Sequence, residues 1–253
     1  MSSTKEYLFE RQQEQCIEWI RQRYGIEIDP EADEEEWEEL AREYWDMLAA
    51  EDAAVEAEYQ WLNRHSHDEF FHEFFYELSK ACSLLPLGNS LNTDTLNKLI
   101  YAHAVTLMEA LISSVVRKLL ISEPALLMNL VAGHKQLSVR TVTLKEIADE
   151  PKAVENIALD ALSKMSFHNL QTIKSVLTAM FRVHMDGLDA GDIGSICSKR
   201  HDIIHRNGKT VDDESIDLTT QEVERAISAI REFVEDLNAR IYKALTALNP
   251  NGF

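Results

Sequence analysis

Helix-breaking residues are rare in this sequence, and their scarcity constrains the fold more than any other feature. Only 8 glycines and 5 prolines occur among 253 residues, so long helices can run without interruption. Apolar residues recur at helical spacing, as Trp37, Leu40, Tyr44 and Leu48 do. No segment shows the sustained alternation that builds a sheet. The sequence therefore predicts an all-α protein.

Capping signals indicate where several of these helices begin and end. Ser66 with Glu69, and Thr219 with Glu222, have the spacing of capping boxes, in which side chain and backbone satisfy each other at a helix start. The second box predicts a closing helix that runs to about Leu248. A long apolar helix is expected over 95–121. Another is expected from about Gly191, with Asn207-Gly208 as its stop.

The segment "PLGNSLNTD", residues 86–94, gathers turn-forming residues and predicts the main boundary of the chain. Residues 1–90 carry 23 Asp and Glu against 7 Lys and Arg, whereas residues 91–253 carry 21 against 18. We therefore expect an acidic helical N-terminal region over 1–90 and a second domain over 91–253. The acidic helices of residues 31–58 either mimic nucleic acid and cover a basic cleft of the same chain until a trigger moves them, or are solvated helix faces. A regulatory partner for the acidic N-terminal region is also expected.

The cysteines indicate the compartment. Cys16, Cys82 and Cys197 are odd in number and form no CxxC pair, so the sequence predicts neither a disulfide framework nor a cysteine zinc site. Reduced thiols are typical of a cytoplasmic protein, which is the location we expect.

The apolar stretch Leu99 to Ile121 has the length of a membrane span. It contains four residues that a span rarely tolerates together: His103, Glu109, Arg117 and Lys118. We expect a helix in the core of a soluble protein, with no membrane partner. His103 is expected to be a hydrogen-bonded core histidine.

The stretch "KRHDIIHRNGK", residues 199–209, contains the most unusual arrangement in the chain. On a helix, apolar residues fall on one inward face: Ile193, Ile196, Cys197, Ile203 and Ile204. Arg200 projects into the middle of that face, at about 100° per residue. A guanidinium placed there needs a carboxylate, an interface or a ligand, because an unpaired buried charge is costly.

His201 and His205 allow a metal-dependent interpretation. Their i,i+4 spacing puts two imidazoles on one helix face, and "HDIIH" is similar to the HExxH pattern, with Asp202 in place of Glu. The shorter Asp is an imperfect substitute, and no third ligand is evident downstream. We predict neither a metal nor a cofactor, and a hydrolase using both histidines remains an alternative.

Arg200 and His205 allow a second interpretation, the cutting of RNA without metal. That reaction needs a group that moves protons, as histidine does near neutrality. It also needs a fixed cation on the phosphate, which the planar guanidinium of arginine supplies. Lys199, Arg206 and Lys209 surround the pair and form the densest basic cluster of an acidic chain.

"RHDIIHRNG" resembles the R-x4-6-H motif of the HEPN-domain family, in which His201 is the usual polar residue after the arginine. HEPN domains are small helical bundles whose long first helix carries an acidic residue, and "HAVTLMEALISSVV" offers Glu109 in that place. The motif lies towards the C-terminus, before a long closing helix. The resemblance covers about residues 91–248 and is greatest to the RiboL-PSP-HEPN group.

This resemblance implies a metal-independent endoribonuclease that leaves 2′,3′-cyclic phosphate and 5′-hydroxyl ends. It also implies a homodimer in which two motifs line one cleft, formed through the motif-bearing face. His205 would be the acid/base, Arg200 the phosphate anchor, and Glu109 the residue that orients Arg200. His201 and Asp202 would have supporting roles. RNA would be held by Lys199, Arg206, Asn207 and Lys209.

HEPN proteins recur as toxins and in antiviral defence, which is the biological role that the resemblance implies. In a related toxin group a tyrosine two residues after the motif histidine is modified by a partner enzyme, but this chain has Asn207 there. That control mechanism is therefore not carried over. Some HEPN domains are inactive modules that bind RNA or a partner protein, and this alternative also stays open.

Overall fold

A computed structural model describes residues 2–88 and 92–249 of the chain. Residues 89–91 of the predicted boundary segment lie outside this description. The protein is all-α, as the sequence predicts. In the described residues, the β-pairing is limited to one isolated bridge between Lys209 and Ser215.

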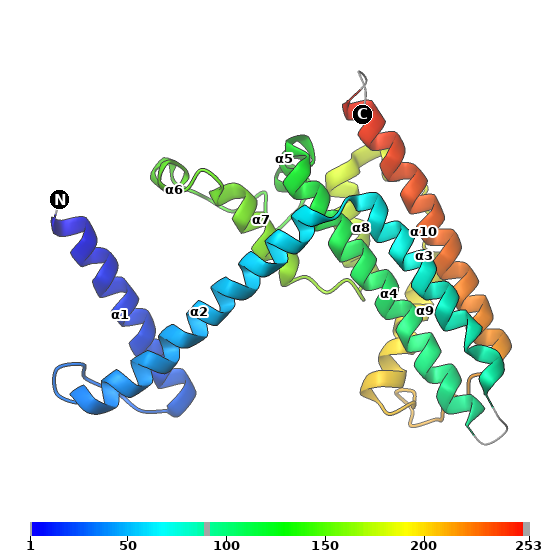
Figure 1. Ribbon diagram of the computed structural model, residues 1–253, viewed down its shortest axis with the longest axis horizontal. Helices are drawn as coiled ribbons and strands as arrows, with labels where there is room; N and C mark the ends of the chain where they lie inside the picture. Colours follow the sequence, from blue (N-terminus) through cyan, green and yellow to red (C-terminus); the bar gives the residue numbers. More distant parts are fainter. Residues whose placement is uncertain (1, 89–91, 250–253) are drawn as a thin grey trace. The chain divides into compact units, whose positions relative to one another are not determined.

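The chain divides into two compact units after Arg64. The first unit consists of α1 (Ser2–Tyr24) and α2 (Glu34–Arg64), which form a hairpin (Figure 1). Its small core consists of five buried residues: Cys16, Ile20, Ile28, Ala41 and Tyr44. The ring of Trp19 packs on Tyr44 with 5.5 Å between centroids, which adds aromatic contact to a core with few members.

The second unit is a helical bundle. Its elements are α3 (His67–Ser83), η1 (Leu85–Leu87), α4 (Thr93–Ser122), α5 (Pro124–Gly133), α6 (Leu144–Asp149), α7 (Ala153–Ser163), α8 (Leu170–Phe181), η2 (Arg182–Met185), α9 (Gly191–His205) and α10 (Thr220–Leu248). Both predicted capping boxes are confirmed, because Ser66 and Thr219 each accept a hydrogen bond from the backbone N–H three residues on.

The central element of the bundle is α4, which contacts α3, α5, α7, α9 and α10. The long helices α3, α4 and α10 lie side by side in Figure 1. Buried side chains occur along the whole length of α4, from Ile100 through Met108 to Leu120. Residues on α4 are therefore held against several neighbours at once, which fixes their positions relative to α9.

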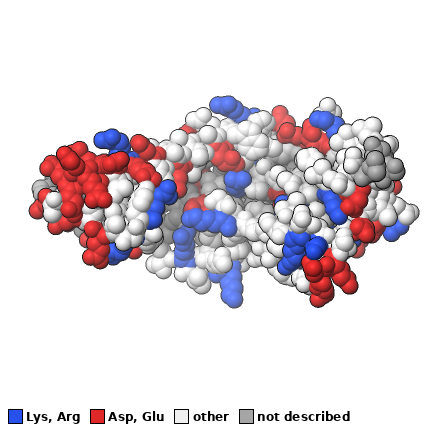
Figure 2. Space-filling model, turned by 90° about the horizontal axis from the view of Figure 1, so that it is seen from below, with Lys and Arg blue, Asp and Glu red and all other residues white. Residues whose placement is uncertain are grey.

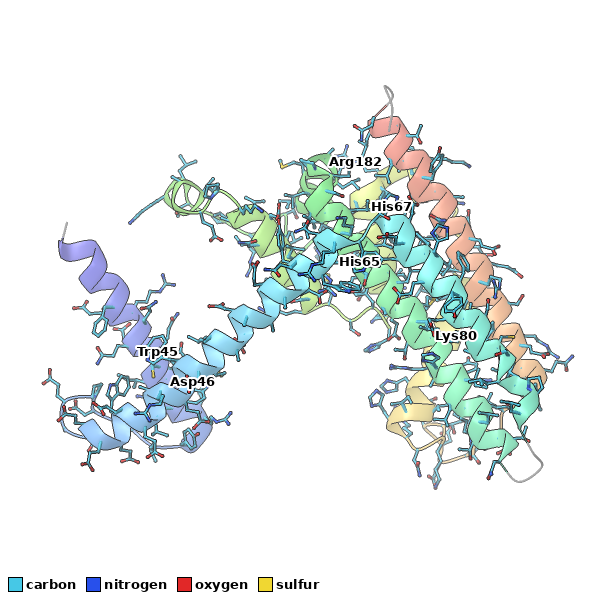
Figure 3. All side chains as sticks on the ribbon, viewed as in Figure 1. Trp45, Asp46, His65, His67, Lys80 and Arg182 are labelled. Atoms are coloured by element: carbon cyan, nitrogen blue, oxygen red, sulfur yellow. The ribbon has the colours of Figure 1, made fainter. Side chains whose placement is uncertain are left out.

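The division between the units differs from the boundary predicted over 86–94. Because Phe70, Phe71 and Phe74 of α3 are buried and α3 packs along α4 and α10, this helix belongs to the second unit. Figure 3 shows His65 and His67 close to its start and Lys80 towards its end. Turn residues separate α3 from α4 in the sequence, but both helices belong to one unit.

The acidity is concentrated further towards the N-terminus than the prediction placed it. Residues 1–64 contain 19 Asp and Glu against 6 Lys and Arg, whereas residues 65–253 contain 25 against 19. Figure 2 shows carboxylates gathered over the first unit, whereas both signs of charge occur over the second. The strongly acidic surface therefore belongs to the α1–α2 hairpin.

In the described part of the chain, α4 is the one helix that is long and apolar enough to cross a membrane by length and composition alone. Of its most apolar window, 61% is buried inside the protein, and the core helix of a soluble protein passes the same test. His103 does not lie in the core, contrary to the prediction. It is exposed together with Leu99, Thr106 and Ala110 on one stripe of α4, which has the i,i+4,i+7 spacing of a helix face.

Candidate functional site

The motif-bearing helix α9 ends as predicted at Asn207-Gly208. Both residues have left-handed backbone angles, with φ of 53° and 75°. The N–H of Gly208 donates to the carbonyl oxygens of Asp202 at 3.3 Å and Ile203 at 3.1 Å, which satisfies the last turn of the helix. His205 and Arg206 therefore lie at the junction of α9 with the following loop.

The loop after α9 is fastened to α4. Asn97 Nδ2 donates to the carbonyl of Leu218 at 2.7 Å, and Asp94 Oδ1 accepts from the N–H of Leu218 at 3.0 Å. The Leu218 N–H, and then the ammonium of Lys98, hold the pKa of Asp94 below its usual range. The end of the motif is thereby positioned against the start of the central helix.

Arg200 forms an ion pair with a carboxylate of the same chain. Its Nη2 lies 3.7 Å from Oε2 of Glu109 on α4, and each of the two side chains is only 16% exposed. Four of the predicted inward residues of α9 are buried: Ile193, Ile196, Cys197 and Ile203. Of the three explanations that the sequence allowed for a guanidinium on this face, the intramolecular ion pair is present.

Ile204 is the exception on that face, because it is 50% exposed and the sequence predicted it to be buried. The prediction used only the angular position of Ile204 around the helix, at about 100° per residue, and not its position along the helix axis. Ile204 lies in the last turn of α9, where His205, Arg206 and Asn207 are exposed as well. The apolar face of α9 therefore ends before the helix does.

The Arg200–Glu109 pair leaves polar atoms unsatisfied. Nε of Arg200 and Oε1 of Glu109 are buried and have no hydrogen-bond partner. Burial raises the pKa of Glu109, an effect partly offset by Arg200 and then by His168. Buried unsatisfied groups of this kind cost about 1–3 kcal/mol each. The ion pair therefore leaves one buried donor and one buried acceptor without hydrogen bonds.

The other basic residues of the motif are also paired. Lys199 Nζ lies 4.0 Å from Oε1 of Glu222, Lys209 Nζ lies 2.7 Å from Oδ1 of Asp213, and Arg206 pairs with Asp202. Each cation of the predicted RNA-binding cluster therefore has a carboxylate beside it. The positive patch expected from the sequence is balanced in charge, and the uncharged Asn207 is exposed beside it.

A shallow depression of about 600 Å³ lies between α9 and the turn that precedes α8. His201, Asp202 and Arg206 line it from α9 and its end, and His168 and Asn169 line it from the turn. Glu109, Arg200 and His205 are not among its lining residues. The imidazole of His205 continues the same side of α9, with its centroid 4.6 Å from that of His201.

His168 is the residue that sequence reasoning missed. It stands in "SFHN", a short turn whose Asn169 caps α8 by accepting from the N–H of Gln171 at 2.8 Å. Nothing in the local sequence separates this histidine from any other loop histidine. Its relevance arises from the packing of α8 against α9, which brings the turn to the motif.

A third ligand for the metal-dependent alternative is not found in the described part of the chain. No group of three or more His, Cys, Asp or Glu residues has the arrangement of a metal site there. The rings of His201 and His205 lie side by side, with 4.6 Å between centroids. Asp202, which stands between them in the sequence, pairs with Arg206. The chemistry of this donor set favours proton transfer and anion contacts.

The thiol of Cys197 lies within the same cluster but is not suited to act as a nucleophile. Burial, and then the carboxylate of Glu109, raise its pKa to about 11, while Arg200 lowers it. Burial alone raises the pKa of Cys16 to about 11 as well. At neutral pH both residues are protonated thiols, and the thiolate is the reactive form.

We expect the three thiols to differ in their rates of reaction with Ellman's reagent at pH 8. Cys82 is only partly buried and should react rapidly in the native protein. Cys16 and Cys197 should react at least about 100-fold more slowly, because both burial and the low thiolate fraction protect them. All three should react at one rate in urea. Rapid reaction of Cys197 in the native protein, identified by mass spectrometry of the labelled peptides, would contradict the packing of α9.

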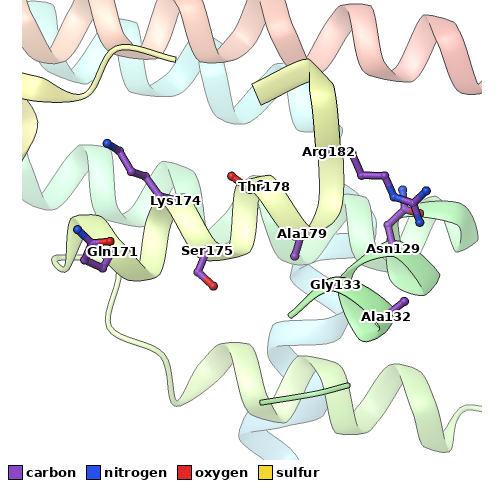
Figure 4. Close-up of a pocket in the computed structure, with 9 residues that line it drawn as sticks. All are labelled: Asn129, Ala132, Gly133, Gln171, Lys174, Ser175, Thr178, Ala179 and Arg182. Carbon is purple, nitrogen blue, oxygen red and sulfur yellow. The ribbon is translucent and has the colours of Figure 1, made fainter. Parts of the chain in front are cut away.

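A second cavity, of about 660 Å³, lies between α5 and α8. Figure 4 shows Arg182 beside Asn129 at one end and Lys174 further along α8. Neither cation forms an ion pair with a described residue. Asn129 Nδ2 donates to the carbonyl of Met180 at 3.0 Å, so this amide already has a hydrogen-bond partner within the fold. This cavity provides unpaired cations for comparison with the motif.

Comparison of the chain with models of known protein families, with curated proteins and with solved structures finds no match.

Proposed function

We propose that the chain is a metal-independent endoribonuclease of HEPN type that acts as a homodimer. The observation that supports this most is the placement of Arg200, Glu109 and His205 by α9 and α4. A guanidinium that is 16% exposed and lies beside Glu109 is about one and a half turns from an exposed imidazole. These are the two groups that RNA transesterification requires, a phosphate anchor and a proton acceptor.

The proposed reaction begins with the 2′-hydroxyl of the substrate. His205 accepts its proton as the 2′ oxygen attacks the adjacent phosphorus, and the bond from phosphorus to the 5′ oxygen breaks. Arg200 stabilises the charge that develops on the non-bridging oxygens. The products are a 2′,3′-cyclic phosphate and a 5′-hydroxyl. Glu109 orients the guanidinium, and the 3.7 Å contact leaves other N–H groups for the phosphate.

RNA binding by this site has to compete with internal ion pairs. Lys199, Arg206 and Lys209 each exchange a carboxylate for a phosphate in the proposed complex, while Asn207 donates without such an exchange. Exposed pairs of this kind contribute about 0–1 kcal/mol, so a phosphate can displace them. The acidic hairpin of residues 1–64 repels RNA generally, and binding is expected to be confined to the motif.

The proposed dimer forms through the motif-bearing face. Ile204 and Val211 are exposed apolar residues on that segment. A second copy that covers this face would remove apolar surface from water. The biological role that we propose with this site is that of a cytoplasmic toxin or defence effector, with the acidic hairpin contacting a regulatory partner.

A catalytically inactive HEPN module that binds RNA or a protein is the second candidate. The observation that favours it is the charge balance of the motif, where every cation has an internal carboxylate. The nuclease and an RNA-binding module both predict RNA binding that depends on Arg200, and only the nuclease predicts strand cleavage.

The two candidates separate when binding and cleavage of one fluorescently labelled RNA are followed together, with EDTA present and the oligomeric state measured by light scattering. The nuclease predicts a dimer that binds and cuts. Binding without cleavage would favour the inactive module. A monomer that leaves the RNA unbound and intact would contradict the nuclease and the RNA-binding module, and only a module that binds a protein would be left.

A further inference from the structure

We propose that His168 is the second proton-transfer residue of this site and protonates the 5′ oxygen of the leaving nucleotide. This inference rests on the ribonuclease function proposed above. It assigns a catalytic residue outside the R-x4-6-H motif, in the turn before α8.

The depression between this turn and α9 would receive the 5′ oxygen and the leaving nucleotide, whereas Arg200 and His205, which do not line it, would contact the substrate outside it. His168 and His201 line it from two different elements, and Arg206, Ser198 and Asn169 add hydrogen-bond donors. The lining also contains the carboxylate of Asp202, which pairs with Arg206. The two imidazoles, the guanidinium and the neutral donors can contact the backbone of the leaving nucleotide. His205 adjoins the depression through His201, whose ring centroid is 4.6 Å away.

The surroundings of His168 leave it accessible and held in place. Ser166 Oγ lies 2.6 Å from its Nδ1 and 2.8 Å from its Nε2. The hydroxyl can hydrogen-bond to only one ring nitrogen at a time, which leaves the other nitrogen for the substrate. The neighbouring residue Phe167 is buried and fixes the turn to the bundle.

Charged groups face His168 from each neighbouring element. The carboxylate of Glu109 on α4 interacts electrostatically with His168. His201, Asp202 and Arg206 line the depression from α9 and its end.

The proposed step completes the proton balance of the reaction. His205 takes one proton from the 2′-hydroxyl, and His168 gives one proton to the 5′ oxygen as the phosphorus–oxygen bond breaks. The reaction yields one neutral 5′-hydroxyl and one cyclic phosphodiester. Exchange of protons with water then restores both histidines. A general acid of this kind contributes about 10²–10⁴-fold to the rate.

The test uses two RNA substrates and the full-length protein. One substrate has the ordinary 5′ oxygen at a single cleavage position, and the other has sulfur in its place. A thiolate leaves without a proton, since thiol pKa values are about 8.5 and lie far below those of alcohols. Variants His168→Ala and His168→Gln are compared with wild type and with His72→Ala, which replaces an exposed histidine of α3.

We expect both His168 variants to cut the oxygen substrate at least about 100-fold more slowly than wild type does. With the sulfur substrate they should come within about threefold of wild type. His205→Ala should be slow on both substrates, because the 2′-hydroxyl still has to lose its proton. His72→Ala should match wild type, and the thermal unfolding of the His168 variants should be unchanged.

Two other outcomes would contradict the proposal, and they distinguish the role of His168 from the ribonuclease function. If the His168 variants cut the oxygen substrate as fast as wild type, or are equally slow on both substrates, His168 is not the general acid and the ribonuclease function still stands. If wild type cuts neither substrate, both the ribonuclease function and the role of His168 are overturned.

Discussion

Alanine at Arg200 or at His205 is expected to reduce RNA cleavage by about 100-fold or more. His205→Ala removes the proposed proton acceptor and should leave RNA affinity almost unchanged, since the imidazole is exposed at the end of α9. Arg200→Ala removes the phosphate anchor and should weaken both binding and cleavage. Initial rates and dissociation constants on the same RNA separate the two effects.

The controls for this prediction are Lys174→Ala and Arg182→Ala in the cavity between α5 and α8. They remove the same charge from the same unit of the protein, away from the motif. We expect their cleavage rates to lie within about threefold of wild type. Equal losses in the control and motif variants would indicate a general charge effect and would contradict specific roles for Arg200 and His205.

Replacing Glu109 by alanine is expected to destabilise the protein by about 2 kcal/mol. The change leaves the guanidinium of Arg200 largely buried without its carboxylate, and removal of one member of a buried pair costs about 3–5 kcal/mol. We expect a smaller value because the two side chains are each 16% exposed and the contact is 3.7 Å long. Urea unfolding followed by circular dichroism gives the free energy of unfolding.

A double-mutant cycle identifies the cause of this loss. Glu109→Leu combined with Arg200→Met replaces the pair by apolar side chains, and we expect the double variant to be more stable than Glu109→Leu alone. Additive losses from the two changes would mean that the pair contributes no coupling energy. In that case another feature of α4, such as the packing around Met108, would explain the effect.

Local signals in the sequence predicted the individual helices well. The capping boxes at Ser66 and Thr219 and the stop at Asn207-Gly208 depend on neighbouring residues, and all three are confirmed. The inward positions of Ile193 and Cys197 follow from helical spacing in the same way. The all-α class follows from such signals added along the chain.

Features that depend on packing between distant segments were not predictable in this way. The turn after α3 resembled a domain boundary, and only the burial of Phe70 and its neighbours shows that α3 belongs to the bundle. The pairing of Lys199 with Glu222 joins two helices, so a count of basic residues along the motif overestimated the positive charge. His168 reaches the depression through the packing of α8 on α9.

The measurement that tests the central proposal most directly is cleavage of a defined RNA by the purified protein in EDTA, followed by analysis of the product ends. The proposed mechanism predicts cleavage by wild type with 2′,3′-cyclic phosphate and 5′-hydroxyl ends, and its loss in His205→Ala. Cleavage that appears only when metal is restored, or products with 5′-phosphate ends, would contradict a metal-independent reaction centred on Arg200 and His205.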